Sequence, residues 1–232
     1  MIKQLFLIPI TFLSLTPIAQ AANPDHLKQL LETRVCQRCD LTDAQLTDVN
    51  LNGADLRGAN LSGADLSSAN LSEALLSQAV LSDAKLTYAN LSGADLSQTN
   101  LTEANVARAN LSQVNLAQSN LSDSDFRGAN LSKAKLENAI LNRANFERAN
   151  LTQGNLFQVA ALETNFTGAK LNSINLEKSI LEASSFREAD LTEANLTNAN
   201  LQHSGFNKAN LSRAILREAD LRNAKMAIAT LS

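Results

Sequence analysis

The sequence predicts an all-β solenoid, a parallel β-helix of square cross-section, and it does so through strict periodicity. Every fifth residue from Leu41 to Leu231 is large and apolar, and 36 of these 39 central positions are Leu or Phe; the exceptions are Val106, Ala161 and Met226. Two residues before the central position 26 of 39 residues are Ala, and directly before it 25 of 39 are Asn or Asp. A five-residue period fits neither a 3.6-residue helix nor a two-residue strand alternation, so it requires a repeat architecture.

A second period of 20 residues sets the number of pentads in each coil. Central Phe residues recur at this spacing, and so does an Asn in the position before the central residue. The two series are Phe126, Phe146, Phe166, Phe186 and Phe206, and Asn50, Asn70, Asn90, Asn110, Asn130 and Asn150. Four pentads per coil would place residues 20 apart above one another, where like side chains form ladders. The 39 pentads then make just under ten coils, a rod roughly 47 Å long at about 4.8 Å per coil.

The residue types within a pentad indicate which positions face inward. We expect the central Leu or Phe and the Ala two residues earlier to point into the coil, because a small residue leaves room for a large one across a narrow interior. The other three positions are mostly Asn, Asp, Ser, Thr, Gln, Gly or charged. Asn, Asp, Ser and Gly suit the tight turns that corners every five residues require.

The tandem pentads resemble the A-(D/N)-L-x-x motif of the pentapeptide repeat family, as at 54–56 (Ala-Asp-Leu) and 59–61 (Ala-Asn-Leu). The resemblance covers residues 36–232. The opening stretch 36–41 (Cys-Gln-Arg-Cys-Asp-Leu) is similar to that of exported bacterial, especially cyanobacterial, members. The resemblance implies a right-handed quadrilateral β-helix and no common enzymatic activity.

Residues 1–21 are predicted to be a secretory signal peptide. Lys3 precedes an apolar stretch over 5–18, and the small-x-small sequence at 19–21 (Ala-Gln-Ala) marks cleavage after Ala21. A retained membrane anchor is the alternative, but the Pro, Ser and Thr residues within the stretch make it a poor span. The mature chain is therefore expected to lack a transmembrane segment and to reside in the periplasm, or in the thylakoid lumen if the source is photosynthetic.

Residues 22–35 are predicted to form a short helix that caps the solenoid. Asn23 can accept from the first helical N–H groups, and Pro24 suits the first helical position. Leu27, Leu30 and Leu31 follow helical spacing, which gives the helix an apolar face for the open end of the first coil. A partner-binding helix is the alternative.

Cys36 and Cys39 are the only cysteines, and both fall on inward positions. In an exported chain we expect a structural disulfide that ties the capping helix to the first coil. Free buried thiols and a thiol-redox pair are the alternatives, although a redox motif of the thioredoxin type expects a βαβ context. A zinc site expects four ligands, and His26 and His203 lie far apart in the sequence.

The charge of the chain argues against a nucleic-acid partner. Lys and Arg number 20 and Asp and Glu 23, so removal of Lys3 leaves a net charge of −4, whereas nucleic-acid binding normally needs a basic surface. A DNA-mimicking topoisomerase regulator, the main functional alternative, needs a strongly acidic surface and a cytosolic location. No catalytic residues, cofactor or metal ligands can be assigned from the repeat background.

One group of apolar residues interrupts the polar outer surface. Ile140, Ala160 and Ile180 replace the usual Asn or Asp of one column in three successive coils, and Phe157 and Leu162 occupy outward positions nearby. Such a cluster often marks a protein-binding surface. The alternative is a bulge over 159–162 that turns some of these side chains inward.

The C-terminal coil is a second candidate contact site. Met226, Ile228 and Leu231 lie in it, and no closing helix follows them in the sequence. An uncovered coil end can bind a partner or a second copy of the chain, so we consider a homodimer through this coil. A frayed end is the alternative.

Two further surface features are expected from the columns. Arg127 with Glu147, and Arg143 with Glu163, stand 20 apart and would form stacked ion pairs. The Asn ladder and the neighbouring uncharged column over 52–212 make a polar wall that could bind a glycan, although this is also the ordinary composition of such repeats. The combined prediction is an exported, non-enzymatic scaffold that acts through protein contacts.

Overall fold

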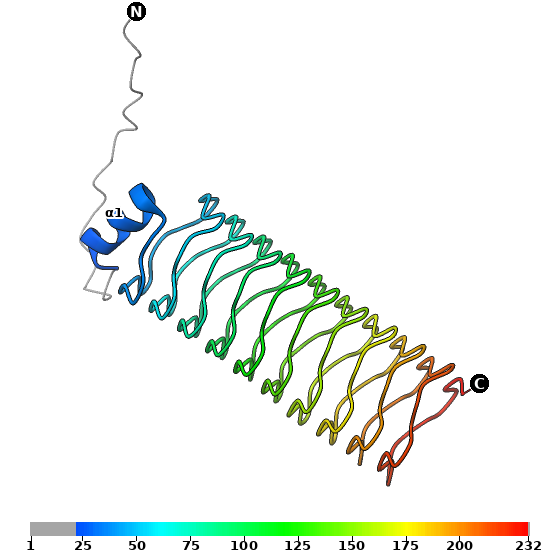
Figure 1. The fold of residues 1–232 in the computed structure, drawn as a ribbon. Coiled ribbons are helices and arrows are strands. Elements are labelled where there is room, and N and C mark those ends of the chain that lie inside the picture. The colour runs from blue at the N-terminus through cyan, green and yellow to red at the C-terminus, as the bar shows by residue number, and fades with distance from the viewer. Residues whose placement is uncertain (1–21, 232) are drawn as a thin grey trace, which may run out of the picture.

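The computed structural model describes residues 22–231, which form a straight solenoid with one helix at its N-terminal end (Figure 1). This helix, α1, spans Pro24–Thr33 and lies within the range predicted for the cap. The predicted signal peptide, residues 1–21, lies outside the described residues.

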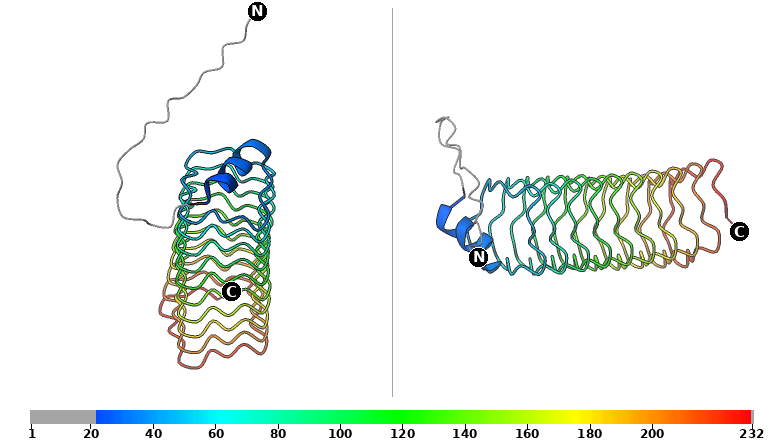
Figure 2. Two further views of the ribbon diagram at one scale, coloured as in Figure 1. Left: turned by 90° about the vertical axis from the view of Figure 1, so that its left-hand side faces the viewer. Right: turned by 90° about the horizontal axis from the view of Figure 1, so that it is seen from above.

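The coils contain four pentads each, as predicted. The residue before each central position forms a parallel single-residue bridge with the residue 20 positions later, from Val35↔Asp55 to Asn210↔Thr230. The N–H of Leu41 donates to the carbonyl of Asn60 (2.7 Å), and the same spacing of bonds repeats along the rod. Figure 2 shows the coils stacked in register from two sides. The right-handed sense of the coil stays a prediction.

Each corner is a β-turn whose third residue has left-handed backbone. In the first full pentad the N–H of Ala44 donates to the carbonyl of Leu41 (3.1 Å), and Asp43 has φ 56°. A positive φ at this position is the geometry of a type II turn, which favours Gly or Asn. The corresponding positions of other pentads nevertheless hold many Gln, Glu and Arg residues. The expected turn composition is therefore only partly right, because bonds between coils, such as that from Asp43 N–H to the Ser62 carbonyl (2.9 Å), hold the turn whatever the residue.

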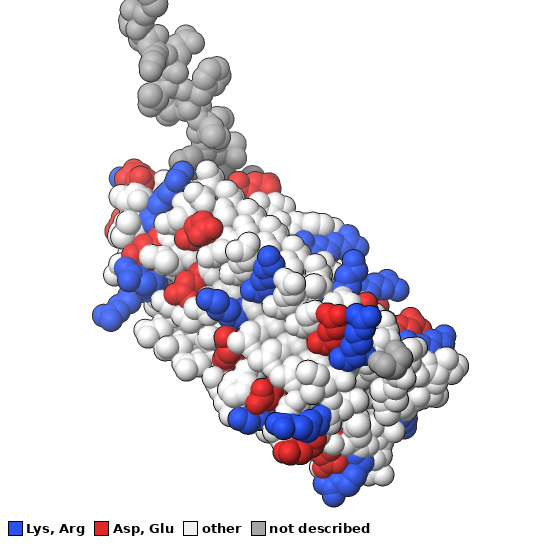
Figure 3. Space-filling model, turned by 45° about the vertical axis from the view of Figure 1, so that its right-hand side comes forward, with Lys and Arg blue, Asp and Glu red and all other residues white. Residues whose placement is uncertain are grey.

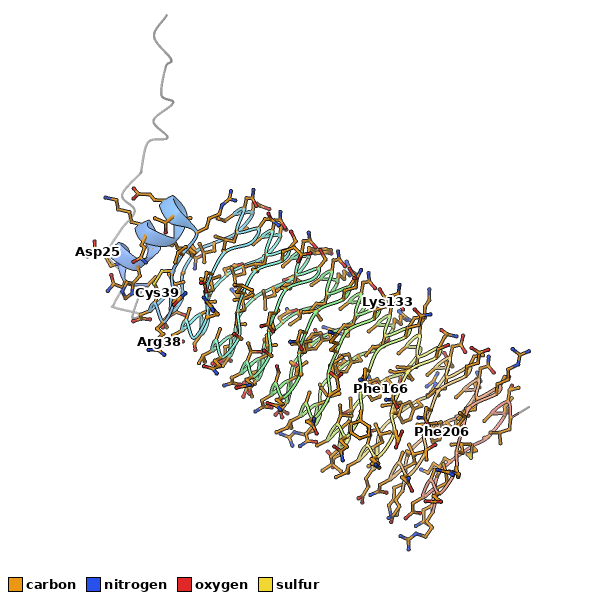
Figure 4. All side chains as sticks on the ribbon, viewed as in Figure 1. Asp25, Arg38, Cys39, Lys133, Phe166 and Phe206 are labelled. Carbon is orange, nitrogen blue, oxygen red and sulfur yellow. A yellow bond between two sulfur atoms is a disulfide. The ribbon has the colours of Figure 1, made fainter. Side chains whose placement is uncertain are left out.

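The interior consists of the two predicted inward columns. The central Leu and Phe side chains and the Ala side chains two residues earlier are buried from Cys39 to Leu211, with few exceptions. Five Phe rings stack along one side, with centroids 4.9 to 5.4 Å apart, and Figure 4 marks Phe166 and Phe206 among them. Some buried positions that usually hold Ala hold a polar residue instead, and its side chain bonds to a nearby backbone carbonyl. The hydroxyl of Ser119, for example, donates to the carbonyl of Leu96 at 2.7 Å.

Helix α1 begins and ends with the expected caps. The side chain of Asn23 accepts from the N–H groups of Asp25 and His26. Pro24 is the first helical residue. Arg34, the residue after the helix, has left-handed backbone, and its N–H donates to the carbonyl of Leu30. Leu30 is fully buried against the first coil, but Leu31 is 52% exposed. The prediction that Leu31 faces the coil is wrong, because the helix presents a narrow stripe to the coil rather than a broad face.

The helix lies over the edge of the first coil and completes part of its hydrogen bonding. The N–H of Asn23 donates to the carbonyl of Asp40 (3.2 Å), and the Nε2 of Gln29 donates to the carbonyl of Val35 (2.8 Å). These bonds satisfy backbone carbonyls at the open edge of the first coil, which is the function expected of a cap.

Candidate functional site

The apolar column of the sequence analysis is a continuous feature of one side of the rod. Ile140 pairs with Ala160, and Ala160 pairs with Ile180, in the same parallel bridges as every other coil. Ile140 is 41% exposed and Ile180 is 50% exposed. The neighbouring inward residue Ala161 stays buried, so the proposed bulge over 159–162 is absent and the column faces outward.

Phe157 and Leu162 widen this column within the coil of Ala160. Leu162 is 37% exposed, and Phe157 is half-buried beneath the ammonium group of Lys178, whose Nζ lies 5.4 Å from the ring centroid. We call Ile140, Phe157, Ala160, Leu162 and Ile180 the apolar patch. Its members form a cross, with one arm along the rod and the other along a single coil.

The apolar patch lacks the side-chain bonds that stabilise the polar coils. In the preceding coil the Oδ1 of Asn120 accepts from the N–H (3.0 Å) and the hydroxyl (2.7 Å) of Ser122. Ile140, Ala160 and Ile180 cannot make this Asx bond. The N–H of Leu162 instead donates to the Oδ1 of Asn142, one coil earlier, at 3.0 Å. The apolar residues therefore contribute neither a buried core nor a turn bond.

Acidic side chains flank the apolar patch, an arrangement that was not predicted from the sequence. The three coil segments that carry the patch, 137–143, 157–163 and 177–183, contain four acidic and two basic residues. Glu137, Glu163 and Glu182 pair with no Lys or Arg among residues 22–231. We call these three residues the acidic rim. Writing the sequence out at 20-residue spacing reveals them. Glu137 shares the column of Phe157, Glu182 shares the column of Leu162, and Glu163 lies in the next column.

The two basic residues within these three segments, Arg143 and Lys178, already have acidic partners. Arg143 donates twice to Asp123, with its Nε 2.7 Å and its Nη2 2.6 Å from the two carboxylate oxygens. Hydrogen bonding to this guanidinium lowers the pKa of Asp123. The Nζ of Lys178 lies 3.7 Å from Glu177. Within these three segments, the charged residues that remain without an ion pair are therefore all acidic.

The ion pairs expected from the columns are formed with other partners. Arg127 binds Asp125 of its own coil, with its Nη2 2.6 Å from the carboxylate, rather than Glu147. Arg143 pairs with Asp123 rather than with Glu163. The prediction was wrong because a flexible side chain can reach carboxylates within its own coil and in the coils on either side.

Cys36 and Cys39 form the predicted disulfide, but it does not link two segments. Both residues follow α1 and belong to the first corner, with their Cα atoms 5.3 Å apart. Cys36 is 0% exposed and Cys39 is 4% exposed, and the Sγ of Cys36 lies 3.2 Å from the carbonyl oxygen of His26 in α1. Figure 4 marks Cys39 next to the helix. The disulfide therefore does not link the cap covalently to the first coil, as was expected, but packs beneath α1. Because both cysteines are buried, little sulfur surface is accessible for thiol exchange.

The C-terminal coil is more exposed than the coils before it. Ile228 is 81% exposed and Leu231 is 57% exposed, whereas Met226 is half-buried against the core. Ile228 also has φ 59°, an unfavourable conformation for a β-branched residue. The candidate contact residues of this coil are thus exposed to different degrees.

A corner hollow of about 430 Å³ lies beside Tyr88, Arg108, Arg127 and Gly128. Arg108 donates to the hydroxyl of Tyr88, and its guanidinium carbon lies 5.7 Å from the ring centroid. Arg127 is held by Asp125. The hollow is therefore a shallow notch at a Gly corner, and two of its arginines already bind protein groups.

The polar wall is internally hydrogen-bonded. The Nδ2 of Asn110 donates to the Oδ1 of Asn90 (3.0 Å), and similar bonds link Asn50 to Asn150 through every coil between them. Each inner amide of the ladder, from Asn70 to Asn130, thus donates one bond to a neighbour and accepts one from the other neighbour. This ladder is the structural role expected of stacked amides.

Residues 22–231 contain neither a metal-binding cluster nor a membrane-spanning helix. No group of three or more His, Cys, Asp or Glu side chains in this range is arranged to hold a metal ion. In the same range, no helix is long and apolar enough to cross a membrane. Figure 3 shows one face of the rod, where acidic and basic side chains are scattered among larger uncharged areas.

Comparison with solved structures gives relatives along most of the rod. HetL, a pentapeptide repeat protein involved in heterocyst differentiation regulation from the cyanobacterium Nostoc sp. strain PCC 7120, is 31% identical with a TM-score of 0.66, over 88% of this chain and 92% of its own. Full-length QnrB1, a plasmid-mediated fluoroquinolone resistance protein, is 15% identical with a TM-score of 0.53, over 81% of this chain and 91% of its own, a likeness of fold alone.

Sequence comparison assigns the repeats directly. Among curated protein sequences, none matches this chain. The family model described as Pentapeptide repeats (8 copies) matches residues 39–78, 79–118, 119–156, 163–198 and 194–232. These matches cover most of the chain and coincide with the coils of the solenoid, so the protein belongs to the pentapeptide repeat family.

Proposed function

We propose that this protein is an exported, non-enzymatic scaffold that binds another protein through the apolar patch. The predicted signal sequence supports export to the periplasm, or to the thylakoid lumen if the source is photosynthetic. The right-handed coil implied by the family resemblance is part of this proposal. HetL, which is similar to this chain over most of the rod, is involved in regulation of heterocyst differentiation. A regulatory role of that kind is consistent with a binding function.

The apolar patch is the observation that carries the proposal. Other exposed large apolar residues along the sides of the rod, such as Leu75, Tyr88 and Ile215, occur singly, which is ordinary for a protein surface. The patch instead gathers its members on three adjacent coils, at positions where most coils carry a hydrogen-bonded polar residue. A contiguous apolar surface with a polar surround is typical of a protein-binding site.

A capture experiment tests this function. The mature chain, immobilised, would be exposed to envelope extract beside a variant with Ile140→Asn, Phe157→Ser and Ile180→Asn. Each replacement is a residue that other coils carry in the same column, for example Asn120 and Ser97, so the fold should be retained. We expect a partner that binds the natural chain and is lost from the variant.

A matched control separates the patch from apolar surface in general. The control carries Leu75→Asn, Tyr88→Ser and Ile215→Asn, which remove exposed apolar groups elsewhere on the rod. The control should retain the partner. Equal capture by the natural chain and the patch variant would refute binding through the apolar patch.

A further inference from the structure

We infer that the partner segment bound by the apolar patch is cationic: apolar side chains flanked by Lys or Arg. This inference rests on the proposed function and adds the chemistry of the partner. It follows from the carboxylates around the patch and from the ion pairs that the nearby basic groups already form.

The acidic rim lies on more than one side of the apolar patch. Glu137 precedes Phe157 by one coil in the same column, Glu182 follows Leu162 by one coil, and Glu163 directly follows Leu162. A partner that covers the patch would bring its own flanking groups against these three carboxylates. Acidic flanking groups would be repelled there, and basic ones would be attracted.

One carboxylate of the acidic rim also lacks a hydrogen-bond donor. The Oε1 of Glu137 accepts from the Nδ2 of Asn155 at 2.7 Å. The Oε2 of the same residue is buried and has no hydrogen-bond partner among residues 22–231. An unsatisfied buried acceptor is costly, so a donor that reaches it after a small rotation of the side chain would be favoured.

The ring of Phe157 shows that a cation is accommodated at the apolar patch. The Nζ of Lys178 lies 5.4 Å from the ring centroid, the arrangement of a cation–π contact. An arriving Lys or Arg can replace Lys178, which has Glu177 as a second partner at 3.7 Å. Arg143 repels a cation little, because its guanidinium is engaged by Asp123.

These charges also exclude a second copy of the chain as the preferred occupant. Two copies that meet through their patches about a two-fold axis would bring both acidic rims together, and the repulsion between their carboxylates disfavours this arrangement. The exposed arm from Ile140 to Ile180 spans two coil spacings, roughly 10 Å at about 4.8 Å each. That length suits a short segment with two or three apolar anchors at the centre of a contact.

A library of displayed random peptides tests the partner chemistry without knowledge of the natural partner. Peptides would be selected on the mature chain, with counter-selection on the patch variant Ile140→Asn, Phe157→Ser and Ile180→Asn. We expect the selected sequences to combine apolar residues with Lys or Arg, and to bind the patch variant at least about tenfold more weakly. Their affinity should also fall as salt is raised, because salt screens the attraction between charges at the protein surface.

A second pair of variants isolates the rim. The rim variant carries Glu137→Gln, Glu163→Gln and Glu182→Gln, and its control carries Glu32→Gln, Glu73→Gln and Glu218→Gln, which produce the same net charge away from the patch. The selected peptides should bind the rim variant several-fold more weakly and the control unchanged.

Each outcome separates the inference from the proposed function. Patch-dependent peptides without basic enrichment, bound equally by the rim variant, would overturn the cationic partner and leave the patch as a binding surface. A selection that yields no peptide able to distinguish the natural chain from the patch variant would overturn both.

Discussion

The imidazole of His26 accepts a hydrogen bond from the backbone N–H of Asp40, with the N–H nitrogen 3.0 Å from Nδ1. In the body of the rod such an N–H donates to a carbonyl of the preceding coil, as Asn60 does to Cys39 at 2.8 Å. The side chain of His26 thus supplies the acceptor that the carbonyl of a preceding coil supplies elsewhere in the rod. The cap is therefore a hydrogen-bonding element as well as an apolar cover.

Replacing His26 by Ala should destabilise the first coil. The N–H of Asp40 would lose its acceptor, at a cost of about 1 kcal/mol. Hydrogen exchange of amides in 36–60 should accelerate, while exchange in later coils stays unchanged because repeats unfold partly independently. His203→Ala, at an exposed corner, is the control. Unchanged exchange in the first coil of the His26→Ala protein would contradict the proposed contribution of the imidazole.

Acid should weaken the rod through its paired carboxylates. The bond from the Arg57 guanidinium lowers the pKa of Asp55 from 3.8 to about 2. A carboxyl group whose pKa is lower in the folded state stabilises the fold above pH 3.8, and this contribution is lost as the pH falls towards 2. This contribution is at most roughly 2 kcal/mol, and solvent screening around the half-exposed Arg57 reduces it further.

Unfolding by denaturant measured between pH 2 and pH 6 checks the contribution of Asp55. In Asp55→Asn the free energy of unfolding should be lower at pH 6 and should fall less steeply below pH 3.8 than in the natural chain. Glu32→Gln, on the exposed surface of α1, is the control. Parallel pH curves for Asp55→Asn and the natural chain would show that the ion pair does not contribute.

The Phe stack should tolerate Leu and reject Ala. The ring of Phe166 lies between those of Phe146 and Phe186, with centroids 5.4 and 5.2 Å away. Phe166→Ala should lower the free energy of unfolding by about 3 to 5 kcal/mol through the cavity it leaves. Phe166→Leu should cost less, because Leu fills the same position in the other columns. Similar unfolding curves for the two variants would count against tight packing of the stack.

Restoring the repeat residue within the apolar patch should not reduce stability. Ile140→Asn and Ile180→Asn allow the Asx bond that Asn120 makes with Ser122, so the free energy of unfolding should stay equal or rise by up to about 1 kcal/mol. Leu141→Asn, which buries an amide in the core, should instead destabilise the rod by several kcal/mol. A marked loss of stability in the two Ile variants would mean that the patch has a packing function.

Export should remove the first 21 residues. The predicted cleavage after Ala21 makes Ala22 the first residue of the mature chain, which mass spectrometry of the N-terminal peptide would identify. Ala21→Arg should block cleavage, because a small residue is required before the cut. A full-length chain recovered from the cytosolic fraction would refute export.

The periodic features of the sequence were sufficient for the coil. A five-residue repeat that never loses register defines four sides of equal length, so Leu41 and Leu211 are buried for the same reason although 170 residues separate them. The 20-residue columns likewise predicted the Phe stack and the Asn ladder, because backbone pairing forces residues with this separation to lie above one another.

Details that depend on side-chain reach were not predictable in this way. The ion pairs of Arg127 and Arg143 go to Asp125 and Asp123, because several carboxylates lie within reach of a flexible exposed side chain. The sequence also pointed to Leu31 as part of the buried helix face, but only Leu30 is fully buried there.

The sequence by itself determined the family, the coil and the direction in which nearly every repeat residue points, because a strict period leaves the backbone one way to pair. Only the tertiary structure decided how α1 closes the first coil, where the buried Cys36–Cys39 disulfide lies relative to it, and which charges remain unpaired around Ile140 and Ile180. These features depend on packing and on competition between neighbouring charges, and a one-dimensional period contains neither.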